Sequence, residues 1–559
     1  MALLISITAC ILSALLLALS FPLSLPPEMM QPLQSSGVPI PGWQAAGGFA
    51  QLPWLAFVAL IPFLWVIRRS PSPAAAAGYG YLTGALWLLL HLDWIGSFGV
   101  APVVMLTLFF SLPTALFAWL GQRIFNERSA VLACWGLPAI WTALEYLRSF
   151  GFWALPWNLL GYSQTASLKL IQVADLGGVF AVSFLVMLAN CALFLLFSGH
   201  GGGQRALAHS LLAASLICAA LGYGDWRIGQ LEDMPREQRI QVALVQGGVD
   251  TKGRWSGDEL QRMLGVYEPA SEELARKWSG ERTEERRAQF EDSADSDGFV
   301  ADYTGPLDEP QLLLVWPESC IPKRVEPAHP DDLPLGIWNI VESNENTTLL
   351  MGALSNPHNE DDWENTAVLV RPDHVIEWAY SKVRLVAYGE VVPFRGIVKF
   401  LDYPWGSRDL TGGRDTASFE LRGVQVCPMV CFDNIFSFLF MREARRGSDM
   451  FLLITNNSWY DLKNGIRQHA DIDVLRAVEH RRPLARVSTT GWSHFIEPSG
   501  RISQQSNTDE LATLTQWEGR SSIHSWYTRL GDLFAQLCVL ASILLGLKLV
   551  FAHRSEGWL

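Results

Sequence analysis

The feature that most constrains this chain is the uneven distribution of its apolar residues. Half of all residues are apolar and only 17% are charged, which is unusual for a water-soluble protein of 559 residues. A helix that crosses a bilayer needs roughly 20 mostly apolar residues. Stretches of that kind lie near 2–21, 52–68, 77–95, 102–120, 129–147, 172–198, 207–224 and 532–552. The sequence therefore predicts a multi-span membrane protein.

The same pattern predicts how the chain is divided. Residues 1–224 form a membrane domain with about seven transmembrane helices, and 225–531 form a polar domain that is long enough to bury its own core. Residues 532–552 form a last transmembrane helix, and 553–559 form a tail. The first apolar stretch lacks a basic leading region and ends in a poor cleavage site, which favours a retained helix over a signal peptide.

Basic residues predict the orientation, because Lys and Arg in short loops stay on the cytoplasmic side. They occur in alternate loops and at the C-terminal end, at Arg68-Arg69, Arg123, Arg128, Arg205, Lys548 and Arg554. The loop 22–51 has neither Lys nor Arg, whereas the loop 148–171 carries one of each and departs from the pattern. We expect both termini in the cytoplasm and the 225–531 domain outside, on the periplasmic side in a bacterium.

The polar domain alternates short apolar strands with helical segments. Strands are predicted at 240–245, 312–315, 348–354, 367–370, 424–430 and 451–455, and helices near 257–277, 434–447 and 468–481. Such alternation is typical of an α/β sandwich. Residues 278–310 are charged and poor in apolar side chains, which predicts a mobile surface insertion.

A candidate nucleophile stands where a predicted strand meets a predicted helix. An apolar run ends at Cys431, and Asp433 and Asn434 then precede a helix-like stretch. The unpaired N–H groups and the dipole of a helix N-terminus favour thiolate, the reactive form of cysteine. A single cysteine is more often a small core residue, and this is our interpretation of Cys427.

Cysteine usage is compatible with a free thiol outside the cytoplasm. The polar domain holds Cys320, Cys427 and Cys431, and an odd number leaves at least one cysteine unpaired in an oxidising compartment. No Cys-x-x-Cys pair and no cluster of histidines suggests a metal site. The sequence therefore predicts no metal and no other cofactor.

Three further ionisable residues accompany this cysteine. Glu318 follows an apolar strand that a proline ends, and Lys382 and Glu390 lie eight residues apart in a later segment. Groups at the carboxyl ends of strands converge on one crevice in α/β domains. Each residue alone is more often a solvated surface group, but the order Glu, Lys, Cys at strand ends predicts a catalytic site.

These motifs resemble a known superfamily. The runs Trp-Pro-Glu318, Tyr-Ser-Lys382, Tyr-Gly-Glu390-Val-Val-Pro and Val-Cys431-Phe-Asp are similar to those of the nitrilase, or carbon–nitrogen hydrolase, superfamily. Within it, the chain resembles the bacterial apolipoprotein N-acyltransferase family, on Leu155-Pro-Trp-Asn-Leu-Leu-Gly-Tyr-Ser-Gln164, Leu244-Val-Gln-Gly247, Asn365-Thr-Ala367 and Trp526-Tyr-Thr-Arg-Leu-Gly-Asp532. The resemblance covers nearly the whole chain. It implies a multi-span α-helical membrane domain plus an α/β sandwich of the nitrilase type, with α-β-β-α layers.

The chemistry of these residue types suggests a role for each. Cys431 would attack an acyl ester and form a thioester, which splits one acyl transfer into two easier steps. Glu318 would take and return the proton as general base, and Lys382 would stabilise the oxyanion. Glu390 would orient Lys382 or balance its charge, and Asp433 would cap the following helix or hold charge.

The resemblance also implies the substrates. The donor would be a phospholipid, with phosphatidylethanolamine and its sn-1 chain preferred. The acceptor would be the α-amino group of the diacylglyceryl-cysteine that begins an apolipoprotein, and the product a triacylated lipoprotein. The expected location is the bacterial inner membrane, and the expected state is a monomer without a nucleic-acid partner.

Five aromatic residues are predicted to bind substrate, namely Trp255, Phe394, Trp405, Phe432 and Trp459. Two of them belong to the segment 391–405, which is rich in aromatic residues and interrupted by Pro and Gly. Such residues partition well into the bilayer interface, so we expect a lid that dips into the outer leaflet. A core-packed loop is the alternative.

Two positions depart from the family pattern. Phe432-Asp433 stands where Tyr-Glu is usual, and Asn456-Asn457 where Asn-Asp is usual. These changes leave room for altered acceptor specificity or reduced activity. The rival functions are a membrane-tethered amidase or nitrilase on a small amide, an inactive scaffold, and a transporter. The membrane spans argue against the amidase or nitrilase, and the intact Glu, Lys and Cys argue against an inactive scaffold. The scarcity of acidic residues in the spans argues against a transporter.

Overall fold

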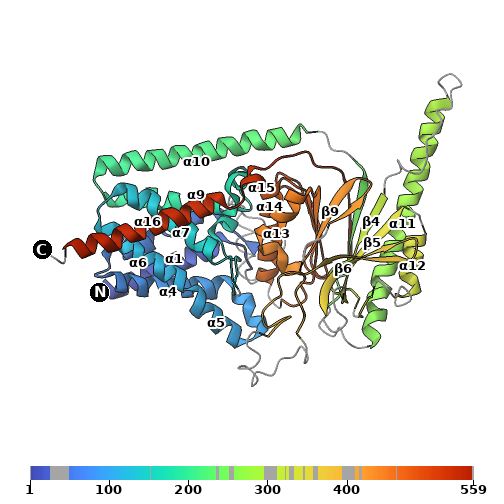
Figure 1. The fold of residues 1–559 in the computed structure, drawn as a ribbon, viewed down its shortest axis with the longest axis horizontal. Helices are drawn as coiled ribbons and strands as arrows, with labels where there is room; N and C mark the ends of the chain where they lie inside the picture. The colour runs from blue at the N-terminus through green and yellow to red at the C-terminus, as the bar shows by residue number, and fades with distance from the viewer. Residues whose placement is uncertain are drawn as a thin grey trace, which may run out of the picture.

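The computed structural model describes residues 2–556 except 25–48, 152, 235–237, 251–256, 295–310, 322, 327–332, 344–345, 357–362, 393–408, 415–417 and 461–462. A bundle of helices forms one end of the molecule and a β-sandwich forms the other (Figure 1). The bundle comes from the N-terminal part of the chain and from the C-terminal helix α16, Leu533–Glu556, which returns to it.

The bundle consists of long helices linked by short turns of helix. The longer helices are α1 (Ala2–Ser20), α3 (Ile61–Arg69), α4 (Pro73–His91), α5 (Val100–Phe110), α6 (Leu112–Asn126), α7 (Leu137–Leu147), α9 (Ala174–Ser198) and α10 (Gly203–Glu232). The shorter elements are β1 (Leu23–Ser24), β2 (Phe49–Ala50), η1 (Pro53–Phe57), η2 (Asp93–Phe98), η3 (Leu132–Gly136), η4 (Leu160–Gln164) and α8 (Leu168–Ile171).

Among the described residues, four segments are long and apolar enough to cross a membrane: Leu3–Ser20, Val100–Asn126, Ala174–Ser198 and Gly203–Glu232. Leu533–Leu549 is a shorter apolar helix. The predicted span 52–68 is divided into η1 and α3, each of which has a proline in its first turn. The span 129–147 is divided into a π-turn and α7. The chain is therefore a membrane protein, and the number of crossings stays a prediction.

The polar domain is a sandwich of two six-stranded sheets. The first sheet has the order β14-β3-β4-β5-β6-β7, formed by Ala512–Glu518, Ile240–Gln246, Gln311–Val315, Thr347–Ser355, Glu364–Arg371 and Val375–Ser381. The second has the order β13-β12-β11-β10-β9-β8, formed by Ile502–Gln505, His494–Ile496, Leu484–Ser488, Met450–Thr455, Val424–Val430 and Phe419–Leu421. In each sheet the three central strands are parallel, so their carboxyl ends share one edge.

Helices cover the two outer faces, which completes the α-β-β-α layers expected. On the first sheet these are α11 (Gly257–Ala294) and α12 (Leu335–Glu342), whose apolar residues form a separate core with its outer face. On the second sheet they are α13 (Ser437–Arg446) and α14 (Lys463–His480), which lie toward the bundle (Figure 1). One continuous apolar core joins the inner faces of both sheets, α13, α14 and the bundle.

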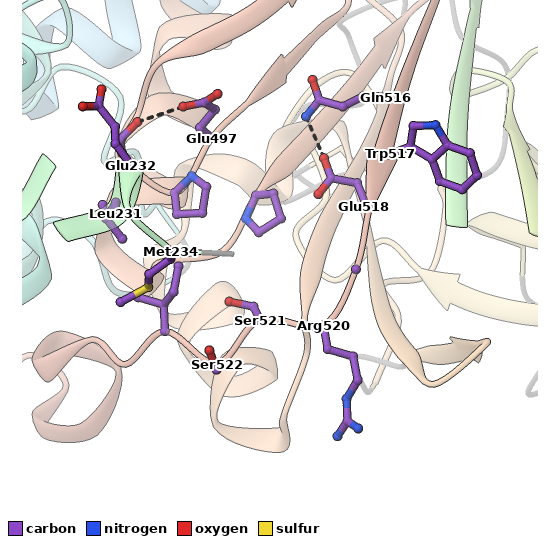
Figure 2. Close-up of a pocket in the computed structure, with 15 residues that line it drawn as sticks. Leu231, Glu232, Met234, Glu497, Gln516, Trp517, Glu518, Arg520, Ser521 and Ser522 are labelled. Carbon is purple, nitrogen blue, oxygen red and sulfur yellow. Dashed lines mark hydrogen bonds between the residues drawn. The ribbon is translucent and has the colours of Figure 1, made fainter. Parts of the chain in front are cut away.

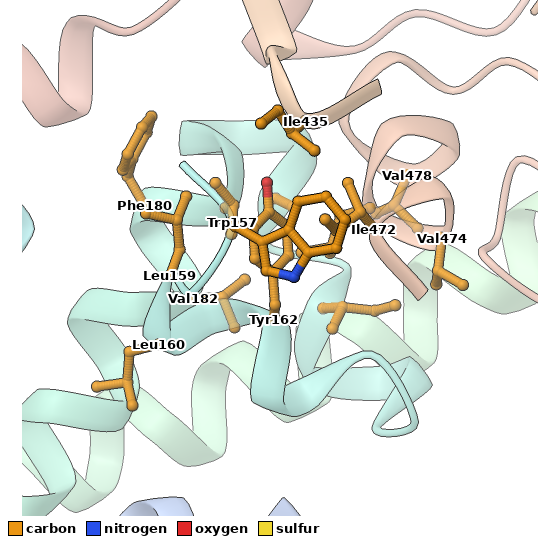
Figure 3. Packing of buried hydrophobic residues seen from close by; sticks show 14 of the residues in the cluster. Trp157, Leu159, Leu160, Tyr162, Phe180, Val182, Ile435, Ile472, Val474 and Val478 are labelled. Carbon is orange, nitrogen blue, oxygen red and sulfur yellow. The ribbon is translucent and has the colours of Figure 1, made fainter. Parts of the chain in front are cut away.

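The bundle and the sandwich share a tightly packed contact. Trp157, Tyr162 and Val182 of the bundle lie against Ile435 and against α14 residues such as Ile472, Val474 and Val478 (Figure 3). α9 bends at Gly178, whose φ of 67° and close approach to the Tyr527 ring exclude a side chain. The bend leaves the N–H of Val179 without a helical partner, and it donates to Glu479 of α14 at 2.8 Å. A polar bond thus anchors the sandwich at the start of a membrane helix.

Three predicted helix limits differ from the structure. α10 continues to Glu232, eight residues beyond the predicted span 207–224. α11 continues to Ala294, beyond the predicted end near 277, where Trp278 is buried against Trp517. The expected helix 434–447 begins at Ser437, after a 3₁₀ turn, η7, over Cys431–Ile435. All six predicted strands agree with the structure to within a few residues.

Candidate active site

Strand ends bring the predicted residues together. Glu318 follows β4, Lys382 follows β7 and Cys431 follows β9, and all three side chains are buried. Lys382 Nζ lies 3.4 Å from Glu318 Oε1 and 2.9 Å from Glu390 Oε1. Burial opposes the charge of Lys382, but Glu390 and Glu318 outweigh it and raise its pKa well above the usual value. The lysine is therefore a fixed cation between two carboxylates.

The side-chain amide of Asn365, for which the sequence predicted no role, holds both carboxylates. Asn365 Nδ2 donates to Glu318 Oε1 at 2.6 Å and to Glu390 Oε1 at 2.9 Å. The other oxygen of Glu318 accepts from the backbone N–H of Asn456 at 2.7 Å, and that of Glu390 from Val386 N–H at 2.9 Å. Each carboxylate is held at both oxygens, which fixes its orientation.

The backbone around Glu318 needs a glycine on the neighbouring strand. A Cβ at Gly352 of β5 would lie 2.5 Å from Glu318 Cα and 2.7 Å from Pro317 O. Gly352 N–H donates to Pro317 O at 3.2 Å, and Ser319 has a φ of 55°. The chain turns sharply after Glu318, so the carboxylate points back to the strand ends.

Cys431 occupies a strained turn rather than a helix N-terminus. Its φ is 50°, and the next α-helix begins six residues later. Burial and the charge of Glu318 raise the pKa of its thiol to about 12, although Lys382 and Thr455 act in the opposite direction. The expected effect of a helix dipole on this thiol is absent, because the α-helix begins only at Ser437, and burial dominates. A buried thiol of this kind needs a base to take its proton.

Of the two tasks expected of Asp433, capping the next helix or holding charge, the structure excludes the cap, since the N-cap of α13 is Phe436. Its carboxylate accepts from Tyr380 O–H at 2.7 Å and from the N–H groups of Val383 and Arg384 at 3.2 and 2.8 Å. Burial raises its pKa to about 6, against the effect of these bonds and of Lys382. Asp433 therefore ties the turn of Cys431 to the chain on either side of Lys382.

An apolar pocket opens where the sandwich meets the bundle. Phe432 and Tyr460, which follow β9 and β10, form one wall, and Leu385 and Tyr388 of the segment after Lys382 form another. The bundle contributes residues of η2, α5 and the following segments, among them Trp94, Phe98, Pro102, Met105, Leu106, Phe109 and Trp153. Tyr388 O–H lies 3.2 Å from Met105 Sδ, which closes this wall. We refer to this space as the apolar pocket.

The structure separates the residues predicted to bind substrate. Phe432 lines the apolar pocket, whereas Trp459 is half-buried in the adjoining turn and Tyr460 takes the place beside the pocket. Trp255, Phe394 and Trp405 lie outside the described residues, as does most of the predicted lid. Cys427 is fully buried in β9, as a core residue should be.

A second hollow lies away from this site. It is lined by Leu231, Glu232 and Met234 at the end of α10 and by the segment 516–523, in which Gln516 donates to Glu518 at 2.7 Å (Figure 2). None of the candidate catalytic residues lines it. Among the described residues, no group of three or more His, Cys, Asp or Glu could hold a metal ion.

Two family models match parts of the chain, and curated relatives match most of it. The family model described as "Carbon-nitrogen hydrolase" matches residues 242–526, just over half of the chain, and the one described as "Apolipoprotein N-acyltransferase N-terminal domain" matches 42–192. An apolipoprotein N-acyltransferase from Geobacter metallireducens is 29% identical over 98% of this chain and 95% of its own length. One from Chlorobaculum tepidum is 27% identical over 90% of this chain and 92% of its own length.

Among solved structures, the similarity covers part of the chain. An amidase from Nesterenkonia AN1 aligns with a TM-score of 0.36 and 15% identity, over 54% of this chain and 98% of its own. The matches in sequence extend over both the bundle and the sandwich. The chain therefore belongs to the carbon–nitrogen hydrolase family and, within it, to the apolipoprotein N-acyltransferases.

Proposed function

We propose that this membrane protein transfers an acyl chain from a phospholipid to the α-amino group of the diacylglyceryl-cysteine of an apolipoprotein. The observation that carries the proposal is the position of the apolar pocket. Its walls come both from the segments that bear Cys431 and Lys382 and from the helices of the membrane bundle. A small soluble amide, the substrate of the rival function, needs no such wall.

The first half of the reaction uses the residues at the strand ends. Glu318 takes the proton from the Cys431 thiol, and the sulfur attacks the ester carbonyl of the phospholipid. Lys382 stabilises the oxyanion of the tetrahedral intermediate, in a site where burial strengthens the interaction. As the intermediate collapses, Glu318 returns the proton to the leaving alcohol, and a lysophospholipid departs from the thioester.

The second half uses the same groups in the opposite sense. The amine of the lipoprotein attacks the thioester, Glu318 accepts a proton from the nitrogen, and the thiol leaves as the amide forms. Glu390 and Asn365 keep the pair oriented throughout, because Asn365 donates to Glu318, Glu390 pairs with Lys382, and Asn365 also donates to Glu390. The donor chain occupies the apolar pocket in both halves, and it leaves with the product.

The test is the intact mass of the purified protein after incubation with phosphatidylethanolamine in detergent. We expect a mass increase of one acyl chain that hydroxylamine removes, present in Cys427→Ala and absent from Cys431→Ala. Cys427 is a matched control, because it lies in β9, four residues before Cys431, and is also buried. An acyl group mapped to Cys427, or no adduct with phospholipid but turnover of a small amide, would contradict the proposal.

A further inference from the structure

The turn that carries Cys431 needs support from outside itself. With a φ of 50°, Cys431 is in the left-handed region, which is strained for a residue other than glycine. Such a conformation persists only where the surrounding structure holds it. η7 has no side-chain cap at its N-terminal end. The group that fixes the peptide after Cys431 must therefore come from another element.

His469 of α14 provides that contact. Its Nε2 lies 3.3 Å from the carbonyl oxygen of Cys431, and its ring is fully buried. Its Nδ1 lies 2.9 Å from Nη2 of Arg486, which can only donate. Nδ1 is therefore the acceptor, and Nε2 carries the proton that His469 donates to Cys431. Burial and the charge of Arg486 lower the pKa of His469 well below its usual value, which keeps the ring neutral.

The support behind His469 is itself fixed by charge. Arg486 Nη1 pairs with Asp473 Oδ2 at 2.8 Å, and Asp473 Oδ1 accepts from Asn434 Nδ2 at 2.7 Å. Asn434 also donates to the backbone oxygen of His469 at 2.9 Å. Asp473 supplies the negative charge in this cluster. Arg486 therefore has a counter-charge, although Asn457, to which it also donates, is neutral. The cluster ties η7, α14 and β11 into one unit.

The membrane bundle presses on the same ring. The Trp157 indole lies 5.3 Å from the His469 ring with an interplanar angle of 17°. Its Nε1 donates to Gln468 Oε1 at 2.9 Å, and Trp94 donates to the same oxygen at 3.1 Å. Two tryptophans of the bundle therefore bind α14 at Gln468, next to His469, and one of them, Trp157, also stacks on the His469 ring.

We propose that His469 is a positioning residue for Cys431 and that Trp157 of the membrane bundle holds it in place. The bond to the carbonyl fixes the peptide plane after Cys431, and this plane sets the direction in which Sγ points. His469 exchanges no proton with the substrate. The inference rests on the proposed function only where acyl-enzyme formation is measured. The contacts that support it involve only Cys431 and its neighbours.

The test compares three substitutions of His469. His469→Phe keeps a ring against Trp157 but has no donor, His469→Gln can place an amide N–H near the Cys431 carbonyl, and the side chain of His469→Asn is too short to do so. We expect acyl-enzyme formation from phosphatidylethanolamine to fall about 100-fold in the Phe and Asn variants, as for a catalytic group misplaced by about 1 Å. The Gln variant should recover most of the rate, and KM should be unchanged in all three.

A second measurement separates this inference from the proposed function. Iodoacetamide reports on Cys431 without a lipid, and its rate at pH 9 should follow the same order among the variants. If the wild type forms no acyl-enzyme but the order of alkylation holds, the proposed function fails and the positioning role stands. If the Asn and Gln variants are equal in alkylation, or if KM rises while kcat is kept, His469 is only a packing residue.

Discussion

The two sheets of the sandwich divide the candidate site between them, and they are supported in different ways. The first sheet carries Glu318 and Lys382, and α11 and α12 cover its outer face on the side away from the bundle (Figure 1). The second sheet carries Cys431, and its helices α13 and α14 pack on the membrane helices. The nucleophile thus belongs to the half that is anchored in the membrane bundle, and the base and the cation belong to the outer half.

The kinds of contact differ accordingly. On the nucleophile side, buried charges cross from the sandwich to the bundle: Arg481 lies 2.8 Å from Asp175 of α9, which also pairs with Arg227 of α10 at 3.0 Å. On the outer side, an amide and backbone N–H groups hold the two carboxylates. The turn of Cys431 is thus held from the side of the bundle, whereas Glu318 and Lys382 come from the opposite sheet.

The largest effect should come from the charge that joins the two parts. Asp175→Asn leaves Arg481 and Arg227 buried without their carboxylate, which typically costs about 3–5 kcal/mol. We expect a clear loss of thermal stability in detergent and slower alkylation of Cys431, because the anchored half loosens. The pair Lys169–Asp225 lies close by but is mostly exposed, so Asp225→Asn should change stability little. Equal effects would contradict the idea that the buried pair holds the nucleophile side.

The next largest effect concerns the outer half. Glu318→Gln and Lys382→Met should each slow acyl-enzyme formation roughly 100- to 1000-fold, the usual loss for a base or an oxyanion donor. The exposed Lys463→Met serves as the control and should keep the wild-type rate.

Alkylation of Cys431 separates the two roles by the sign of a shift. Glu318 raises the pKa of the thiol and Lys382 lowers it, although burial is the larger cause. Iodoacetamide reaction should therefore move to lower pH in Glu318→Gln, since more thiolate is present at a given pH, and to higher pH in Lys382→Met. Shifts in the same direction would show that the two charges do not act on this thiol.

The sequence predicted which residues meet at the site better than it predicted the ionisation of Cys431. Glu318, Lys382 and Cys431 end apolar strands, and parallel strands bring such ends together, so a one-dimensional pattern was sufficient. The ionisation of Cys431 depends on how deeply it is buried and on where the following helix begins, and neither is visible in a strand-to-helix pattern. The 3₁₀ turn moved the start of the helix from the predicted residue 434 to Ser437, so no α-helix N-terminus lies beside the thiol.

The supporting residues were harder to foresee for a similar reason. His469 and Arg486 belong to elements that read as ordinary buried helix and strand, and their partners are distant in the chain. Asn365 was visible only as part of a motif, since its amide acts by bridging two carboxylates that are themselves separated by 72 residues. Long-range polar contacts of this kind leave no periodic signal.

That bridge predicts an intermediate effect. Asn365→Ala removes one donor from Glu318 and one from Glu390, and the loss of a hydrogen bond to a charged group costs about 1.5–3 kcal/mol. We expect acyl-enzyme formation to slow by about tenfold to 100-fold, less than for Lys382→Met, because the lysine still contacts both carboxylates. Asn365→Ser, which can keep one bond, should lie between the wild type and Asn365→Ala. The measurement is the single-turnover rate with phosphatidylethanolamine.

The smallest effect concerns Asp433, which connects the two halves. Its carboxylate lies next to Cys431 in the chain and bonds the segment of Lys382, and its pKa is about 6. Because this value lies above the usual 3.8, the folded protein gains a proton in a range where the unfolded chain stays ionised. The burial penalty of Asp433 is therefore present above pH 6 and is relieved as the pH falls.

Two readouts follow from that sign. Protonation replaces an acceptor with a donor and removes negative charge near Lys382, so acylation should fall a few-fold as the pH drops through about 6. Asp433→Asn should remove this step from the pH profile and have a lower rate at pH 8, by less than tenfold, since Asn keeps one oxygen for Arg384 N–H. The difference in melting temperature, wild type minus Asp433→Asn, should increase as the pH is lowered from 7 to 5. If that difference instead stays constant, Asp433 is ionised throughout, and the link between the two sheets does not titrate in this range.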